Sequence, residues 1–82
     1  MSIFIKQESS RFDQNYKMKD CYSVRSRNPN VVSIEEFKTY VDKFVELNKS
    51  FIEDKDTNIS KLHNGDLVYI VWFNCEIDPK IP

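Results

Sequence analysis

A chain of 82 residues with 40% hydrophobic and 30% charged side chains, one Gly and three Pro has the composition of a globular domain, which excludes disordered and collagen-like chains. Residues 1–82 therefore predict one domain with a small core, since so short a chain buries only about 60 to 65% of its unfolded surface. The net charge is −1, and no apolar run reaches the roughly 18 residues of a membrane span, so we expect a cytoplasmic protein without membrane contact.

Two strands are expected first along the chain. Ser2–Gln7 is a short apolar stretch that predicts an edge strand, and Glu8–Asn15 is polar enough for a loop. From Tyr16 onward, apolar and polar side chains alternate with a period of two, which predicts a strand that ends at the Asn28–Asn30 turn. One face of this strand carries Tyr16, Met18, Tyr22 and Val24, and the other carries Lys17, Lys19, Ser23 and Arg25.

The strongest signal in the sequence is an amphipathic helix over residues 34–54. Ser33 is a good N-cap, Glu36 completes a capping box, and Val32 with Phe37 matches a hydrophobic staple. Apolar residues then recur every three or four positions on an arc of roughly 160°. This arc predicts the face packed on the core, which consists of Ile34, Phe37, Tyr40, Val41, Phe44, Val45, Leu47, Phe51 and Ile52.

A β-hairpin is expected after the helix. The segment His63–Asp66 contains the Asn-Gly pair of a two-residue type I′ turn, in which both turn residues need positive φ. We expect its strands at Asn58–His63 and Asp66–Asn74, in a register that places Leu62 opposite Leu67.

The order of these elements is β-β-α-β-β, which predicts an α+β fold: a two-layer sandwich with one amphipathic helix packed on a small antiparallel sheet. Asp78–Pro82 holds two of the three Pro residues and should form an extended, mobile tail.

The stretch Leu67–Phe73 is apolar on both of its faces, whereas an antiparallel strand with one face in water normally alternates. One helix covers one side of a sheet, so the side that carries Val68, Ile70 and Trp72 needs another cover. The N-terminal segment, a second copy of the chain in a homodimer, or a different protein could supply it. Because apolar patches and Trp anchors are typical of interfaces, we expect protein binding here.

The polar side of the helix is a second candidate surface for protein binding. Four carboxylates fall there within about 40° on the helical wheel: Glu35, Asp42, Glu46 and Glu53. They form either a solvated face beside neighbouring Lys residues or a row that imitates DNA phosphates and engages a nucleic-acid-handling protein. The Lys- and Asn-rich, Gly-poor composition indicates an AT-rich genome, consistent with a phage or mobile element, but it is not evidence of function. On the two candidate surfaces we interpret the chain as an inhibitor or accessory protein, acting in the host cytoplasm.

The alternative function is nucleic-acid binding through Lys17, Lys19, Arg25 and Arg27. Residues 1–30 hold six Lys and Arg against three Asp and Glu, whereas residues 31–82 hold six Lys against ten Asp and Glu. The overall acidity, with an isoelectric point near 5.8, opposes unaided binding to a polyanion. Direct binding to nucleic acid is therefore the second hypothesis.

The sequence carries no pattern typical of an enzyme, a cofactor or a metal site. A single Gly excludes the familiar phosphate-binding loops, and neither a zinc-protease motif nor a nucleophile elbow is present. Cys21 and Cys75 predict free thiols, His63 lies beside the hairpin turn, and Asp54–Asn58 reads as a turn because it lacks the rest of a calcium loop. We therefore expect a non-enzymatic protein-binding module.

Overall fold

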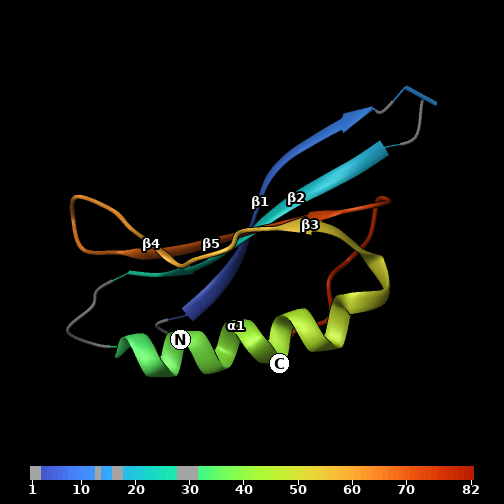
Figure 1. Cartoon of the computed structure of the whole chain (residues 1–82). Helices are drawn as coiled ribbons and strands as arrows, with labels where there is room; N and C mark the ends of the chain where they lie inside the picture. Colours follow the sequence, from blue (N-terminus) through green and yellow to red (C-terminus); the bar gives the residue numbers. More distant parts are fainter. Residues whose placement is uncertain (1–2, 13, 16–17, 28–31) are drawn as a thin grey trace.

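A computed structural model describes residues 3–12, 14–15, 18–27 and 32–82, with the backbone alone at residues 11 and 12. Over these residues one helix packs on a five-stranded antiparallel sheet, which confirms the predicted α+β fold (Figure 1). The strands are β1 (Ile3–Phe12), β2 (Met18–Ser26), β3 (Ile52–Lys55), β4 (Ser60–Lys61) and β5 (Leu67–Phe73). The helical elements are α1 (Ile34–Asn48) and a 3-10 turn, η1 (Lys49–Phe51).

The sheet is centred on β2 and β5, in the order β1-β2-β5-β3. On the side of β5 away from β2, β3 pairs with residues 71–73 and β4 with residues 67–68. Residues 52–61 therefore form one interrupted edge strand. Asp56 fills the interruption, because its N–H donates to Ile70 O (2.9 Å) and its carboxylate accepts from Ile70 N (3.0 Å).

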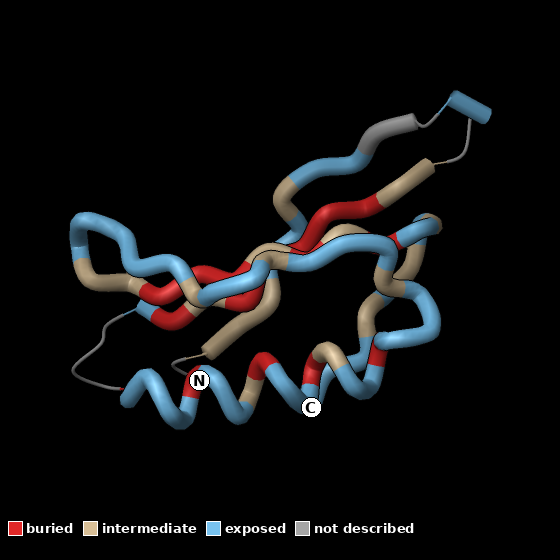
Figure 2. The backbone as a smooth tube through the Cα atoms, viewed as in Figure 1, coloured by how far each residue is buried: buried red, intermediate tan, exposed pale blue. Residues whose placement is uncertain are grey.

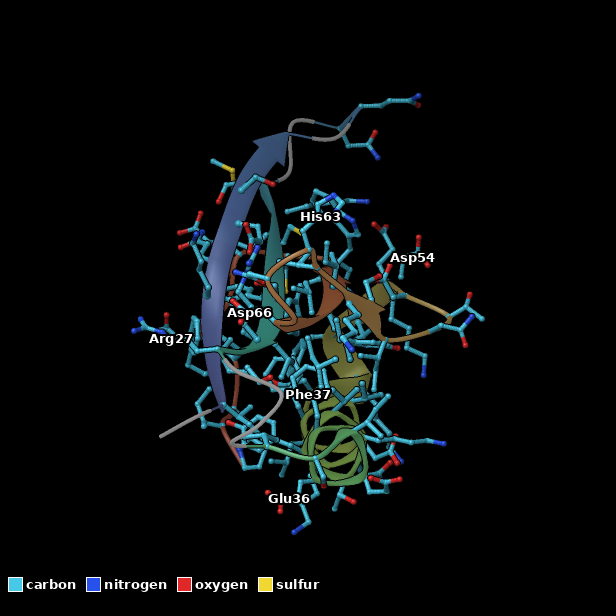
Figure 3. All side chains as sticks on the ribbon, turned by 90° about the vertical axis from the view of Figure 1, so that its left-hand side faces the viewer. Arg27, Glu36, Phe37, Asp54, His63 and Asp66 are labelled. Atoms are coloured by element: carbon cyan, nitrogen blue, oxygen red, sulfur yellow. The ribbon has the colours of Figure 1, made fainter. Side chains whose placement is uncertain are left out.

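The start of α1 matches its prediction. Ser33 Oγ accepts a hydrogen bond from Glu36 N (3.1 Å), and both residues of the staple, Val32 and Phe37, are buried. Figure 3 shows Phe37 on the sheet side of α1 and Glu36 on the opposite side. The local signals for a helix N-terminus thus identified the first residue of the helix, Ile34.

The end of α1 differs from its prediction. The helix stops at Asn48, six residues before the expected end, and the chain turns through η1 into β3. Phe51 and Ile52 continue the helical spacing of apolar residues, so the sequence pattern could not mark this end. Ile52 instead pairs with Phe73 in the sheet and packs against the core from there.

The core lies between α1 and the facing side of β1, β2 and β5 (Figure 2). Its buried members are Tyr22, Val24, Val32, Phe37, Val41, Phe44, Leu67, Tyr69, Val71 and Phe73. The Phe73 ring meets the Tyr22 and Phe44 rings edge to face, at centroid distances of 5.6 and 6.3 Å. Three residues predicted for this core are exposed: Ile34 (55%), Leu47 (44%) and Phe51 (37%). The buried stripe of the helix is therefore narrower than the apolar pattern indicates.

The first strand is longer than expected. β1 continues through the predicted loop to Phe12, and its register shifts at a bulge between Gln7 and Ser9. The bulge lets the polar residues after Gln7 stay paired with β2, although apolar and polar residues do not alternate regularly in this part of the sequence. β1 is an edge strand, as predicted. Tyr16, Lys17 and the Asn28–Asn30 turn lie outside the described residues.

The β4–β5 hairpin is present, but the predicted register is wrong by one residue. Lys61, not Leu62, pairs with Leu67. Leu62 N donates to Asp66 O (2.8 Å) and Gly65 N donates to Leu62 O (2.9 Å), so the loop has three residues and Gly65 adopts φ 90°. A one-residue slip turns a side chain to the other face of the sheet, and Leu62 is accordingly 41% exposed.

The segment after β5 belongs to no helix or strand, and side chains of the rest of the protein bind its backbone by hydrogen bonds. The extended, mobile tail expected at residues 78–82 stays a prediction. Asp20 and Tyr22 bind the backbone of Ile77, and Asn48 binds the backbone of Lys80. These contacts tether the tail to β2 and to the C-terminal end of α1. Over the described residues, no helix has the length and apolar character needed to cross a membrane.

Candidate protein-binding face

The sheet face turned away from α1, here called the open face, is formed mainly by β2 and β5. Cys21 lies opposite Trp72, Ser23 opposite Ile70 and Arg25 opposite Val68. Cross-strand partners point to the same side of a sheet, and the residues between them in sequence, such as Tyr22 and Val71, point into the core. The structure therefore brings the three apolar candidates Val68, Ile70 and Trp72 together on this face.

The centre of the open face is apolar and only partly accessible. Cys21 and Val68 are 3% and 5% exposed, whereas Ile70 and Trp72 are partly exposed. β1 lies beside β2 in the same sheet, and the β1–β2 hairpin curves away from α1 (Figure 1). Within the described residues, the N-terminal segment extends the sheet beside β2.

One side of the open face carries a compact polar cluster of Glu8, Ser23 and Arg25. The Arg25 guanidinium lies 2.9 Å from Glu8 Oε1 through Nη2 and 3.0 Å through Nε, and Nε also lies 3.1 Å from Ser23 Oγ. The Ser23 hydroxyl donates to the same carboxylate oxygen. This hydrogen bond and Arg25 lower the pKa of Glu8 below its usual 4.5, against the opposing effect of burial. Glu8 was predicted to lie in a loop, so the sequence pattern missed its role.

The other side of the open face carries an ion pair between Lys19 and Glu53. Glu53 belongs to β3 and not to α1, so its predicted place in the acidic row of the helix is wrong. The cause is the early helix end at Asn48, which moves residues 52–55 into the sheet. In β3, Asp54 is paired with Trp72 and adds a further carboxylate to the open face.

The cations proposed for nucleic-acid binding are on the open face as well. Arg25 lies six positions after Lys19, and Arg27 two positions after Arg25, along β2 and its end. Because both spacings are even, the three side chains point to one side. Arg27 lies over the Phe4 ring at 5.1 Å from its centroid, within cation–π range. Lys19 and Arg25 are paired with carboxylates. The fourth candidate, Lys17, lies outside the described residues.

Three of the four carboxylates of the predicted acidic row lie on α1. Glu35, Asp42 and Glu46 are exposed, and Glu46 is paired with Lys49 at 3.1 Å. Asp42 and Glu46 also line a cavity of about 500 Å³ between α1 and the 52–61 edge, together with Lys38 and Lys55. The acidic row on α1 therefore has three carboxylates and not the predicted four, and neighbouring lysines partly neutralise its charge.

The residues with reactive side chains are dispersed. Cys21 and Cys75 are free thiols, and Cys21 is buried. His63 is exposed in the β4–β5 loop, on the side of the sheet away from α1 (Figure 3). Asp54 lies in a strand, which corrects its predicted place in a turn. Within the described part of the chain, no three His, Cys, Asp or Glu side chains are grouped as metal ligands.

Comparisons with known proteins add no assignment to this site. Neither a known protein family, nor a curated protein sequence, nor a solved structure matches the chain. Function is therefore inferred from the geometry of the molecule alone.

Proposed function

We propose that the protein is a non-catalytic protein-binding module that contacts its partner through the open face. The observation that supports this proposal is a partly exposed apolar centre, Ile70 and Trp72, inside a rim of paired charges. Protein interfaces have this anatomy, with an apolar core, a polar rim and Trp as a favoured anchor. The two free thiols favour a reducing compartment, in agreement with a cytoplasmic location.

The pairing of charges on the open face favours a protein partner over nucleic acid. Phosphate binding draws its affinity from cations that exchange counterions for phosphates. Glu8 and Glu53 already neutralise Arg25 and Lys19, and Asp54 places a further negative charge beside Trp72. A rim of mixed sign is instead suited to orient a protein partner, because rim charges set association rate and register more than affinity.

The acidic face of α1 supports protein binding less strongly. A carboxylate row that imitates DNA needs regular spacing over several phosphates, and this helix keeps three members, of which Glu46 is paired with Lys49. We therefore propose that, where the module inhibits a nucleic-acid-handling protein, it binds that protein through the open face and not through the helix.

Single-stranded nucleic acid is the second candidate ligand, on one specific observation. Phe4 and Trp72 share the open face with Lys19 and Arg27, so two aromatic rings lie among cations as in single-strand binders. Such binding would weaken steeply as salt rises. A protein partner anchored by Trp72 would depend on salt much less.

Affinity capture with the wild-type chain and two matched variants tests the proposal. Trp72→Ser removes the anchor of the open face, and Ile34→Ser removes an exposed apolar side chain from the start of α1, on the other side of the sheet. Circular dichroism first establishes that both variants are folded. We expect a nuclease-resistant protein partner that is lost with Trp72→Ser and kept with Ile34→Ser. Equal capture by both folded variants, or capture of nucleic acid that salt removes, would contradict a protein-binding open face.

A further inference from the structure

The tail after β5 is held by its main chain at two residues that are three positions apart. Ile77 N donates to Asp20 Oδ2 (3.3 Å), and Ile77 O accepts from the Tyr22 hydroxyl (3.1 Å). Lys80 N donates to Asn48 Oδ1 (2.8 Å), and Lys80 O accepts from Asn48 Nδ2 (2.9 Å). Both backbone groups of each residue are thus bound by side chains of the body.

The side chains that hold the tail are themselves fixed in place. Asn48 is fully buried and also donates to Phe44 O at 2.9 Å, and Asp20 is 2% exposed and accepts from Ser10 Oγ at 2.6 Å. Burial, with the charge of Asp20 adding to it, raises the pKa of Tyr22 above its usual 10.0, so the hydroxyl keeps its proton at neutral pH. These preorganised groups favour binding of an incoming chain because little ordering is left to occur.

The tail is held mainly through its main chain and through one apolar side chain. Ile77 packs against the core as an apolar anchor, whereas the side chains of Lys80 and Ile81 are exposed. Pro79 and Pro82 favour an extended conformation. A groove binds such a chain with little loss of conformational entropy, because the chain is already ordered. A groove with fixed donors and acceptors for a proline-containing main chain has the design of a peptide-binding site.

The tail does not fill the space available along α1. Two cavities of about 550 and 490 Å³ border Pro82. Glu35 and Glu36 line the first, and Asp42 and Glu46 line the second, while Lys43 lines both. The carboxylates outnumber the single lysine, so a chain that continues past the Pro82 position would meet a negative surface.

We propose that this groove is a binding site for an extended, proline-containing peptide with basic residues after the Pro82 position, and that residues 76–82 occupy it in cis. The carboxylates of α1, among them the remaining members of the predicted acidic row, then attract the basic extension of the peptide. The site lies on the helix side of the sheet and does not rest on the function proposed for the open face.

Competition with the tail determines when such a peptide binds. A tethered segment has an effective concentration on the order of 1 mM. The apparent affinity for an added peptide is reduced by the fraction of molecules in which the groove is open. Loosening the tail without touching the groove should therefore increase the apparent affinity.

Two substitutions at one position of the full chain test this. Lys80→Pro removes the N–H that donates to Asn48, whereas Lys80→Ala keeps both backbone groups. The probe is a fluorescent peptide with the sequence of residues 76–82 extended by three lysines, and fluorescence anisotropy measures its binding. We expect Lys80→Pro to bind it about tenfold more tightly than the wild type, and Lys80→Ala to bind it like the wild type. A peptide extended by three glutamates should bind more weakly.

Two binding results would contradict the proposed peptide site. A folded Lys80→Pro variant that binds the peptide no better than the wild type would overturn the proposal. So would equal binding of the lysine and glutamate extensions at low salt. Should Lys80→Pro fail to fold, the side-chain amide signal of Asn48 in the wild-type NMR spectrum is followed instead. It should shift as the peptide is added to about 1 mM and beyond, and a constant signal would refute the site.

Discussion

Two polar residues, Asn48 and Glu8, connect parts of the chain that are far apart in sequence. Asn48 occupies a position on the buried stripe of α1, four residues after Phe44, and joins the end of the helix to the tail. Glu8 sits at the β1 bulge and binds two side chains of β2. Neither role is visible in the sequence, because a polar residue is read as exposed until its distant partner is known.

Asn48→Ala should lower the free energy of unfolding by about 1 to 3 kcal/mol, since three hydrogen bonds are lost in a buried position. Urea denaturation measures the change. Asn74→Ala, at an exposed position next to β5, is the control and should stay within about 0.5 kcal/mol of the wild type. Equal effects of the two substitutions would mean that Asn48 does not anchor the tail.

Ionisation of Glu8 should make the free energy of unfolding depend on pH. Its pKa in the folded protein is lowered below 4.5 by the Ser23 hydrogen bond and by Arg25. A lowered pKa means that the stabilisation is complete above the unfolded value of about 4.5 and is lost as pH falls through the folded value. Thermal unfolding of the wild type and of Glu8→Gln should therefore differ at pH 7 and converge in acid. A constant difference down to pH 2 would exclude this carboxylate as the cause.

At the scale of elements, the sequence predicted those features that depend only on residues close together in the chain. The N-terminus of α1, the edge position of β1, the extent of β5 and the presence of the last hairpin all follow from caps, periodicity and turn residues. The end of α1, the β3 strand and the hairpin register were wrong. Each depends on pairing with β5 or on contact with the tail, and apolar spacing cannot distinguish a continuing helix from a new buried strand.

The cap of α1 offers a direct test at this scale. Ser33→Ala removes the acceptor for Glu36 N and should destabilise the protein by about 1 kcal/mol. Ser50→Ala, in the exposed η1 turn, serves as the matched control and should have little effect. Chemical denaturation of both variants compares them, and an unchanged midpoint for Ser33→Ala would show that the capping bond contributes nothing.

At the scale of the whole molecule, the sheet places two sets of candidate residues on one face, although the sequence analysis assigned them to competing functions. The two-residue period of a strand predicts that Val68, Ile70 and Trp72 of β5 share one face, which the structure confirms. That Lys19, Arg25 and Arg27 share this face could not be predicted, because it depends on the non-local pairing of β2 with β5. Glu8 and Glu53 then convert a basic strand into a rim of paired charges. This charge pairing is the reason for which we propose a protein, and not nucleic acid, as the partner.

Site-specific photo-crosslinking tests the protein-binding open face most directly. A photoreactive residue replaces Ser60, which is exposed on β4 opposite Val68, or Ser50, which is exposed in η1 at the end of α1. We predict that illumination of intact cells gives a covalent protein adduct from position 60 and none from position 50, and an adduct of twice the chain mass would identify a second copy as the partner. Adducts from position 50 alone, or adducts from position 60 that nuclease digests, would contradict the proposed function.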